Sequence, residues 1–152
     1  MQPCVPEKTR PLILIAEQIM MRRYLVAGAA WLEIVTGAAL VVVPDAVCRL
    51  LFGAGLEGAG DPLARVAGIG LIALGIACLP STEEPLRSAV LGLFAYNLGT
   101  AILCVWVVLT TTLRGALLWP AAVLHAAIAA ALLVQLLNQA DAAALGGHRT
   151  RS

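Results

Sequence analysis

Three polar side chains stand inside otherwise apolar stretches of the chain, and their types could do chemistry together. Glu33 lies in "AAWLEIVTG", Asn97 in "AYNLGT" and His125 in "AAVLHAAIA". A carboxyl group and an imidazole in contact can share or relay a proton, and an amide can hydrogen-bond to either. We therefore interpret Glu33, Asn97 and His125 as a candidate ligand or proton site. The alternatives are a hydrogen-bonded cluster that only fixes helix register, and no mutual contact at all.

Other chemistry finds little support in the residue pattern. Cys4, Cys48, Cys78 and Cys104 are widely separated and form no Cys-x-x-Cys pair, so neither a metal site nor a cofactor is predicted. Cys48 and Cys104 are the only pair that the expected topology brings to the outer, oxidising side of the membrane, so they are the only candidates for a disulfide. No Ser-His-Asp set or phosphate-binding loop occurs, and we predict no catalytic residues. One acid and one histidine are enough for acid–base catalysis, but no substrate is indicated, so an enzyme ranks last.

The composition indicates a membrane protein. The chain of 152 residues is 61% hydrophobic and 12% charged, with a mean hydropathy of +0.91, which is far more apolar than an ordinary soluble domain. Its net charge is +1 and its basic residues are scattered. The expected partner is therefore the lipid bilayer, and nucleic acid is excluded.

Four apolar segments have about the length of a bilayer span, and they cover approximately residues 25–43, 63–79, 89–109 and 117–137. Backbone amides in lipid must be satisfied within their own segment, so all four are predicted to be helices. The expected fold is an all-α integral membrane four-helix bundle over residues 24–138. Residues 1–23 are expected to be a cytoplasmic tail or interfacial segment, and residues 139–152 a cytoplasmic tail.

The connection between the first two spans reads "PDAVCRLLFGAGLEGAGDPLAR". Pro44 suits the first turn of a helix, and Gly53 can end one. We predict a short interfacial helix here, on the outer side of the membrane.

Small residues at helical spacing predict where the helices approach one another, since close backbone packing drives association in lipid. Glu33 shares a small-residue stripe with Val26, Ala29, Ala30 and Gly37, so it should face the interior. The predicted packing positions are Gly37, Ala64, Gly68, Gly75, Gly92, Ala95 and Gly99. The stripes leave open whether the neighbour belongs to the same chain or to another copy.

Basic residues predict the orientation of the spans. Seven of them flank the spans on one side of the expected topology and three on the other. By the positive-inside rule both termini are cytoplasmic.

The segments "RLLFG", "ARVAGIGLIALGIACLP", "AYNL" and "LLWPAAVLH" resemble a group of small uncharacterised bacterial four-helix membrane proteins, loosely similar to the DoxX-like group. The resemblance covers Tyr24 to about Leu137. It implies a protein of the bacterial inner membrane that accompanies another complex, in some members a quinone-linked oxidase or a thiosulfate-oxidising complex. It supplies no active-site motif to match against these positions.

Two functions are therefore expected. The leading one is an accessory or scaffold subunit that docks another membrane protein, or a second copy of itself, with the polar trio holding the bundle together. The alternative is a protein that binds or transports a small molecule, quinone-like or lipid-like, or a proton, through Glu33 and His125.

Overall fold

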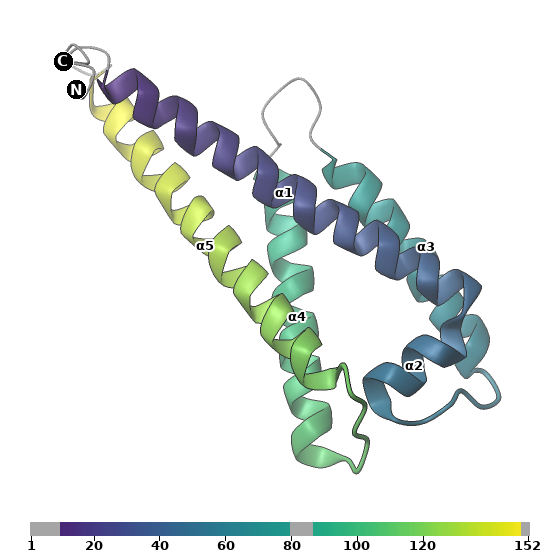
Figure 1. Ribbon diagram of the computed structural model, residues 1–152. Coiled ribbons are helices and arrows are strands. Elements are labelled where there is room, and N and C mark those ends of the chain that lie inside the picture. The colour runs from purple at the N-terminus through teal and green to yellow at the C-terminus, as the bar shows by residue number, and fades with distance from the viewer. Residues whose placement is uncertain (1–9, 80–86, 150–152) are drawn as a thin grey trace, which may run out of the picture.

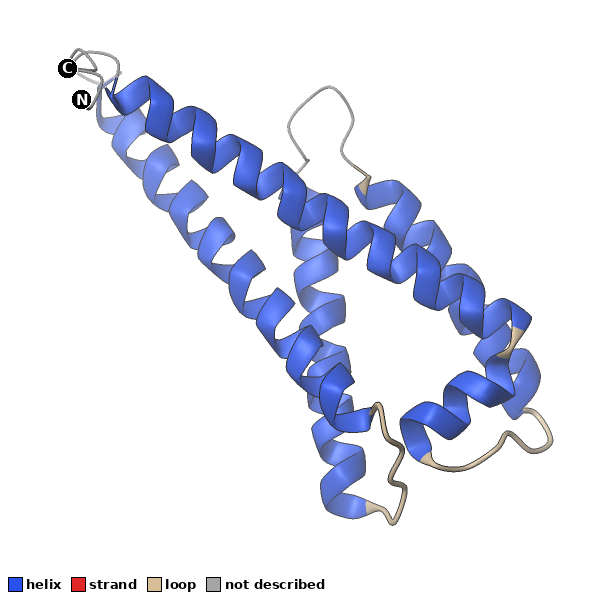
Figure 2. Ribbon diagram, viewed as in Figure 1, coloured by secondary structure: helices blue, strands red, loops and turns tan. Residues whose placement is uncertain are grey.

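The protein is helical throughout its regular elements. The computed structural model describes residues 10–79 and 87–149, and within these ranges it contains five helices and no strand (Figure 2). They are α1 (Arg10–Val42), α2 (Pro44–Phe52), α3 (Gly60–Cys78), α4 (Arg87–Thr110) and α5 (Leu118–Arg149). The predicted all-α fold class is confirmed.

Four of these helices are long and apolar enough to cross a membrane: Ile19–Val42, Gly60–Cys78, Arg87–Thr110 and Leu118–Gln139. With about 1.5 Å of rise per residue, even the 19-residue span is close to the roughly 30 Å of a bilayer core. The chain is thus a multi-pass membrane protein, and the spans agree closely with those expected from hydropathy.

The first and last helices run beyond their spans. α1 begins at Arg10 and α5 continues to Arg149, so much of the two expected tails is helix continuous with a span. The reason lies in composition, because residues 10–21 and 139–145 contain no glycine and are rich in residues that favour helix. Residues 1–9 and 150–152 of these tails lie outside the described residues.

The spans are arranged as two antiparallel helix pairs. α1 packs along α3, and α4 packs along α5, whereas contacts between the two pairs are much sparser. Figure 1 shows α1 and α5 converging where the chain begins and ends, and α2 at the opposite end. We call these the terminal end and the α2 end of the bundle.

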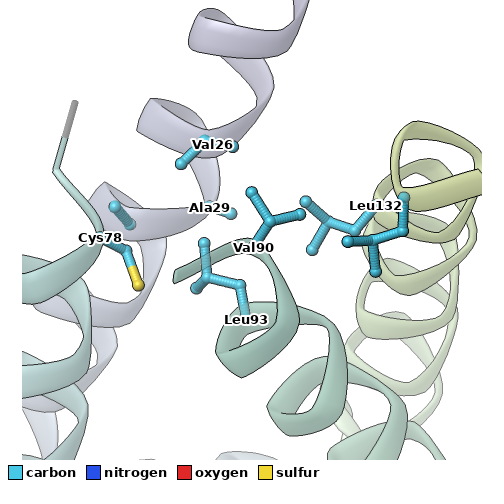
Figure 3. Close-up of a cluster of buried hydrophobic side chains, with 8 residues drawn as sticks. Val26, Ala29, Cys78, Val90, Leu93 and Leu132 are labelled. Carbon is cyan, nitrogen blue, oxygen red and sulfur yellow. The ribbon is translucent and has the colours of Figure 1, made fainter. Parts of the chain in front are cut away.

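Two hydrophobic clusters fill the space between the spans. The cluster nearer the terminal end draws Val26 and Ala29 from α1, Cys78 from α3, Val90 and Leu93 from α4, and Leu132 from α5 (Figure 3). The second cluster joins Cys104 and Val107 of α4 to Leu118 and Ala122 of α5, and Phe52 of α2 packs against it. Both helix pairs therefore share one core near the terminal end.

Glycines set the distance between α1 and α3. A Cβ added at Gly68 would lie 2.6 Å from the carbonyl oxygen of Gly37, and one added at Gly75 would lie 2.6 Å from that of Ala30. Real Cβ atoms do not approach backbone so closely, so only glycine permits this helix spacing. The predicted packing roles of Gly37, Gly68 and Gly75 fit this contact, while Ala64 is half-buried.

The small residues of α4 that were predicted to pack against another helix lie mostly on its exposed face. Gly92 is half-buried with Leu74 at 3.9 Å from an added Cβ, whereas Ala95 and Gly99 are exposed and a Cβ on Gly99 would meet nothing within 4 Å. Ala95 and Gly99 thus lie on an exposed face of α4. The opposite face, with Asn97, Ala101 and Cys104, is the buried one, because its polar amide must be satisfied inside the bundle.

α2 fastens the two helix pairs together at its end of the bundle. It begins at Pro44, in the first-turn position that proline favours, and ends at Gly53, whose φ of 75° is left-handed. The carbonyl oxygen of Leu50 accepts a hydrogen bond of 2.9 Å from the amide of Leu117. A Cβ on Gly115 would lie 2.2 Å from the backbone carbon of Leu51. The short helix predicted between the first two spans is present, and it is tied to the connection between α4 and α5.

Asp45 orders the segment that leads from α2 to α3. Its carboxylate accepts hydrogen bonds from Arg49 Nε at 2.6 Å and from the Leu56 amide at 2.9 Å. The Arg49 side chain and then the Leu56 amide hold the pKa of Asp45 below its ordinary value. A depressed pKa means that this carboxylate stabilises the fold above its unfolded-state pKa, and that the contribution is lost as the pH falls through the folded-state value.

We expect Asp45→Ala to lower the hydrogen-exchange protection of the Leu56 amide at neutral pH, because its acceptor is gone. Acidification below the ordinary Asp pKa of 3.8 should lower the same protection in the wild type but not in the variant. Asp61→Ala is the matched control, since Asp61 also pairs with an arginine four residues on, Arg65. If Asp61→Ala exposes the Leu56 amide equally, the assigned role of Asp45 is wrong.

Candidate functional site

The three polar residues singled out from the sequence meet between three helices. Asn97 of α4 stands in the middle: its Nδ2 donates to Glu33 Oε1 of α1 across a long 3.5 Å contact, and its Oδ1 lies 2.7 Å from Nδ1 of His125 in α5. Nδ2 also donates to the Leu93 carbonyl oxygen at 2.9 Å. We call Glu33, Asn97 and His125 the polar network.

The network lies between the two hydrophobic clusters. Along α4, Asn97 follows Leu93 of one cluster and precedes Cys104 of the other, and along α5 His125 lies between Ala122 and Leu132. Glu33 is 1% exposed and Asn97 is fully buried, while His125 is half-buried. The small residues on the face of Glu33 produce this burial, because Val26, Ala29, Ala30 and Gly37 are buried with it.

Tyr96 is a neighbour of the network that the sequence reasoning missed. Its ring meets the His125 ring edge to face, with centroids 5.9 Å apart and planes at 80°. Its hydroxyl lies beside the Glu33 carboxyl and the Thr100 side chain. Its position immediately before Asn97 in a span was the available signal, since adjacent residues of a helix lie at nearly the same depth.

The hydrogen bonds fix the hydrogen positions of the network. The Leu93 carbonyl can only accept, so the Asn97 atom that faces it must be the NH₂ group. The other amide atom, Oδ1, can only accept, so His125 Nδ1 must carry the hydrogen between them. In the neutral imidazole, Nε2 is then the nitrogen with the free lone pair.

The nitrogen His125 Nε2, which carries this lone pair, is not completely buried. Nε2 has no hydrogen-bond partner among the described residues. The one buried side-chain oxygen or nitrogen that lacks a partner there is Gln135 Oε1, so Nε2 is not buried. An unpartnered and incompletely buried hydrogen-bond acceptor therefore lies within a membrane span, next to a buried amide and a buried carboxyl.

Asn97 also separates the acid from the imidazole. No direct hydrogen bond joins Glu33 to His125 in the described residues, and the amide between them donates to one and accepts from the other. An amide in this position passes polarisation along the chain of hydrogen bonds. Its protons stay on nitrogen, so it does not relay a proton between the two residues. The geometry suits binding and orientation better than a Glu33-to-His125 proton relay.

The described residues contain neither a cluster of metal ligands nor a disulfide. No group of three or more His, Cys, Asp or Glu side chains that could hold a metal ion occurs among the described residues. Cys48, Cys78 and Cys104 are buried free thiols, so Cys48 and Cys104 form no disulfide. Cys4 lies outside the described residues.

Comparisons with protein-family models, with curated proteins and with solved structures found no match to this chain.

Proposed function

We propose that this membrane protein binds a small lipid-soluble molecule at the polar network. The observation that carries the proposal is the unpartnered, incompletely buried Nε2 of His125, whose tautomer is fixed by the buried Asn97. An acceptor at this depth has no water to satisfy it, and an unmet polar group in hydrocarbon is costly. Polar residues in spans that carry such a cost are candidates for function by default.

Burial of the supporting residues adds to the argument. Asn97 is fully buried and Glu33 almost so, and packing from the two hydrophobic clusters holds both in place. A binding group backed by rigid, hydrogen-bonded neighbours loses little freedom when it takes a ligand. Asn97 and Glu33 would thus position the imidazole, and His125 would contact the ligand.

A second candidate function is an accessory subunit that docks another membrane protein. The outward face of α4 favours it, because Ala95 and Gly99 are exposed and space beside Gly99 is open. A glycine that faces lipid destabilises its helix and gains no packing contact in compensation. A partner helix, in contrast, could pack closely against it. The partner would be another protein or a second copy of this chain.

The proposed location is the bacterial inner membrane, with the terminal end of the bundle in the cytoplasm. Support comes from the distribution of charge among the described residues: Arg10, Arg22, Arg23, Arg87 and Arg149 lie toward the terminal end. Arg49, Arg65 and Arg114 lie toward the α2 end. The excess at the terminal end satisfies the positive-inside rule.

Native mass spectrometry of the protein, gently solubilised from its host membrane, tests both functions. We expect a monomer or homodimer that carries a small-molecule adduct, and we expect Asn97→Ala to lose it because the imidazole is no longer held. Asn138→Ala, which alters an exposed asparagine of α5, should keep the adduct. Recovery without an adduct but with another membrane protein at fixed stoichiometry would instead support the accessory subunit and refute the binding proposal.

A further inference from the structure

We propose that the molecule bound at the polar network is a neutral, lipid-soluble hydroxyl compound, whose O–H group donates to His125 Nε2. This inference rests on the proposed function and adds the chemical class of the ligand. It follows from the donor and acceptor assignment of the network, from the depth of His125 and from the surroundings of its ring.

The hydrogen positions in the polar network require that the ligand present a hydrogen-bond donor to His125 Nε2. His125 Nδ1 already gives its hydrogen to Asn97 Oδ1, so the remaining nitrogen of the neutral ring is an acceptor only. An ether, ester or ketone offers only lone pairs and gains nothing there. A hydroxyl group supplies the hydrogen that Nε2 lacks.

The depth of His125 excludes donors from the membrane surface. His125 follows Leu118, the first residue of α5, by seven positions, and it precedes Gln139, the last residue of the span, by fourteen. These separations correspond to about 10 Å and about 21 Å along the helix. A headgroup at either surface stays far from Nε2, so the hydroxyl must belong to a molecule dissolved among the acyl chains.

The surroundings of the ring favour an uncharged ligand. One turn away on α5 are Ala121, Ala122, Ile128 and Ala129, which offer only hydrocarbon. Tyr96 covers one side of the ring with an edge-to-face contact. No arginine or lysine side chain contacts the imidazole among the described residues, so an anionic ligand would be left unpaired in lipid. The Glu33 carboxyl, which could pair with a cation, is 1% exposed and contacts Asn97 instead.

Glu33 acts in this arrangement as a positioning residue. Its Oε1 accepts from the Asn97 amide, and this polarises the amide so that Oδ1 holds the Nδ1 hydrogen more firmly. A firmer Nδ1 hydrogen bond makes the opposite nitrogen a better acceptor, as second partners of histidine do elsewhere. Glu33→Gln keeps an oxygen that can accept, so it should weaken binding less than Asn97→Ala does.

The test uses two photoreactive probes that differ in one group. One is a long-chain alkylphenol with a diazirine on its chain, and the other is the same compound with the phenol O-methylated. Each is titrated into phosphatidylcholine vesicles that contain the purified full-length protein, because this lipid offers no hydroxyl donor. We expect saturable labelling near His125 by the phenol, at about tenfold lower mole fraction than by the ether.

His125→Asn is the decisive variant. Its shorter amide can still donate to Asn97 Oδ1, as Nδ1 does, but it places no acceptor where Nε2 stands. We expect the preference for the phenol to vanish in a variant that unfolds like the wild type. If His125→Asn fails to fold, competition in the wild type between the phenol probe and unlabelled phenol or ether carries the same test.

The outcomes separate this inference from the proposed function. Equal saturable labelling by both probes, lost in Asn97→Ala, would overturn the hydroxyl assignment and leave a binding site at the network. Saturable labelling by neither probe would overturn the hydroxyl assignment, while the adduct seen in native mass spectrometry would still decide the proposed function. A preference for the phenol that persists in His125→Asn would move the acceptor to another residue and refute the assignment to Nε2.

Discussion

Gly68→Ala is expected to separate α1 from α3 and to destabilise the protein by about 1–3 kcal/mol. The added methyl group would start 2.6 Å from the Gly37 carbonyl oxygen and 3.0 Å from Leu40 Cβ. Neither neighbour is the flexible end of a side chain, so one helix must shift. The measurement is reversible unfolding in mixed micelles, with the helical signal followed against the fraction of denaturing detergent.

Gly70→Ala is the matched control, because it makes the same change two residues along the same helix. A Cβ at Gly70 would meet nothing within 4 Å, and alanine is the better helix former by about 1 kcal/mol. This variant should be as stable as the wild type or slightly more so. Equal destabilisation by both variants would show that glycine flexibility, and not the α1–α3 contact, matters in α3.

Asn97→Ala should be the most damaging single change in the polar network, with an expected loss of about 1–3 kcal/mol. It removes the hydrogen bonds to the Leu93 carbonyl and to His125 and leaves Glu33 without its amide donor. Glu33 is 1% exposed, so water cannot replace the lost donor. The same micelle unfolding measurement reports the effect.

Asn138→Ala serves as the control for this change, since Asn138 is exposed on α5. Surface substitutions of this kind usually change stability by less than about 0.5 kcal/mol. A similarly small effect of Asn97→Ala would mean that the network contributes nothing to the fold. In that event, loss of a ligand in Asn97→Ala could be read directly as a binding effect.

The sequence predicted the spans well because hydropathy and length are nearly sufficient constraints in lipid. It also predicted that Glu33 faces inward, since the small residues on its helical face could only belong to a packed side. Asn97 and His125 followed from their depth, as antiparallel spans bring residues of equal depth together. These inferences needed only the pattern within each span and the antiparallel order of the spans.

What the sequence left undetermined depends on contacts between helices. The face of α4 with Ala95 and Gly99 and the face with Asn97 both had reasons to be buried, and only the position of α5 decides between them. The contact of Gly115 with α2 joins segments far apart in the chain, and the sequence around Gly115 does not predict this contact. Tyr96 was missed because its contacts with Glu33 and His125 exist only once α1, α4 and α5 are packed together.

The arrangement of the spans as two antiparallel pairs bears on how the chain assembles during synthesis. α1 and α3 are neighbours in the order of insertion, and so are α4 and α5, so each pair can close as soon as its second helix has entered the bilayer. The first pair needs nothing from the rest of the chain to bring Gly37 against Gly68. Docking of the second pair then completes the polar network, and the Leu117 amide closes onto Leu50. The contact pattern therefore predicts assembly in two local steps and one docking step. A ribosome stalled after α3 is expected to leave a packed α1–α3 hairpin in which Glu33 has no contact with Asn97.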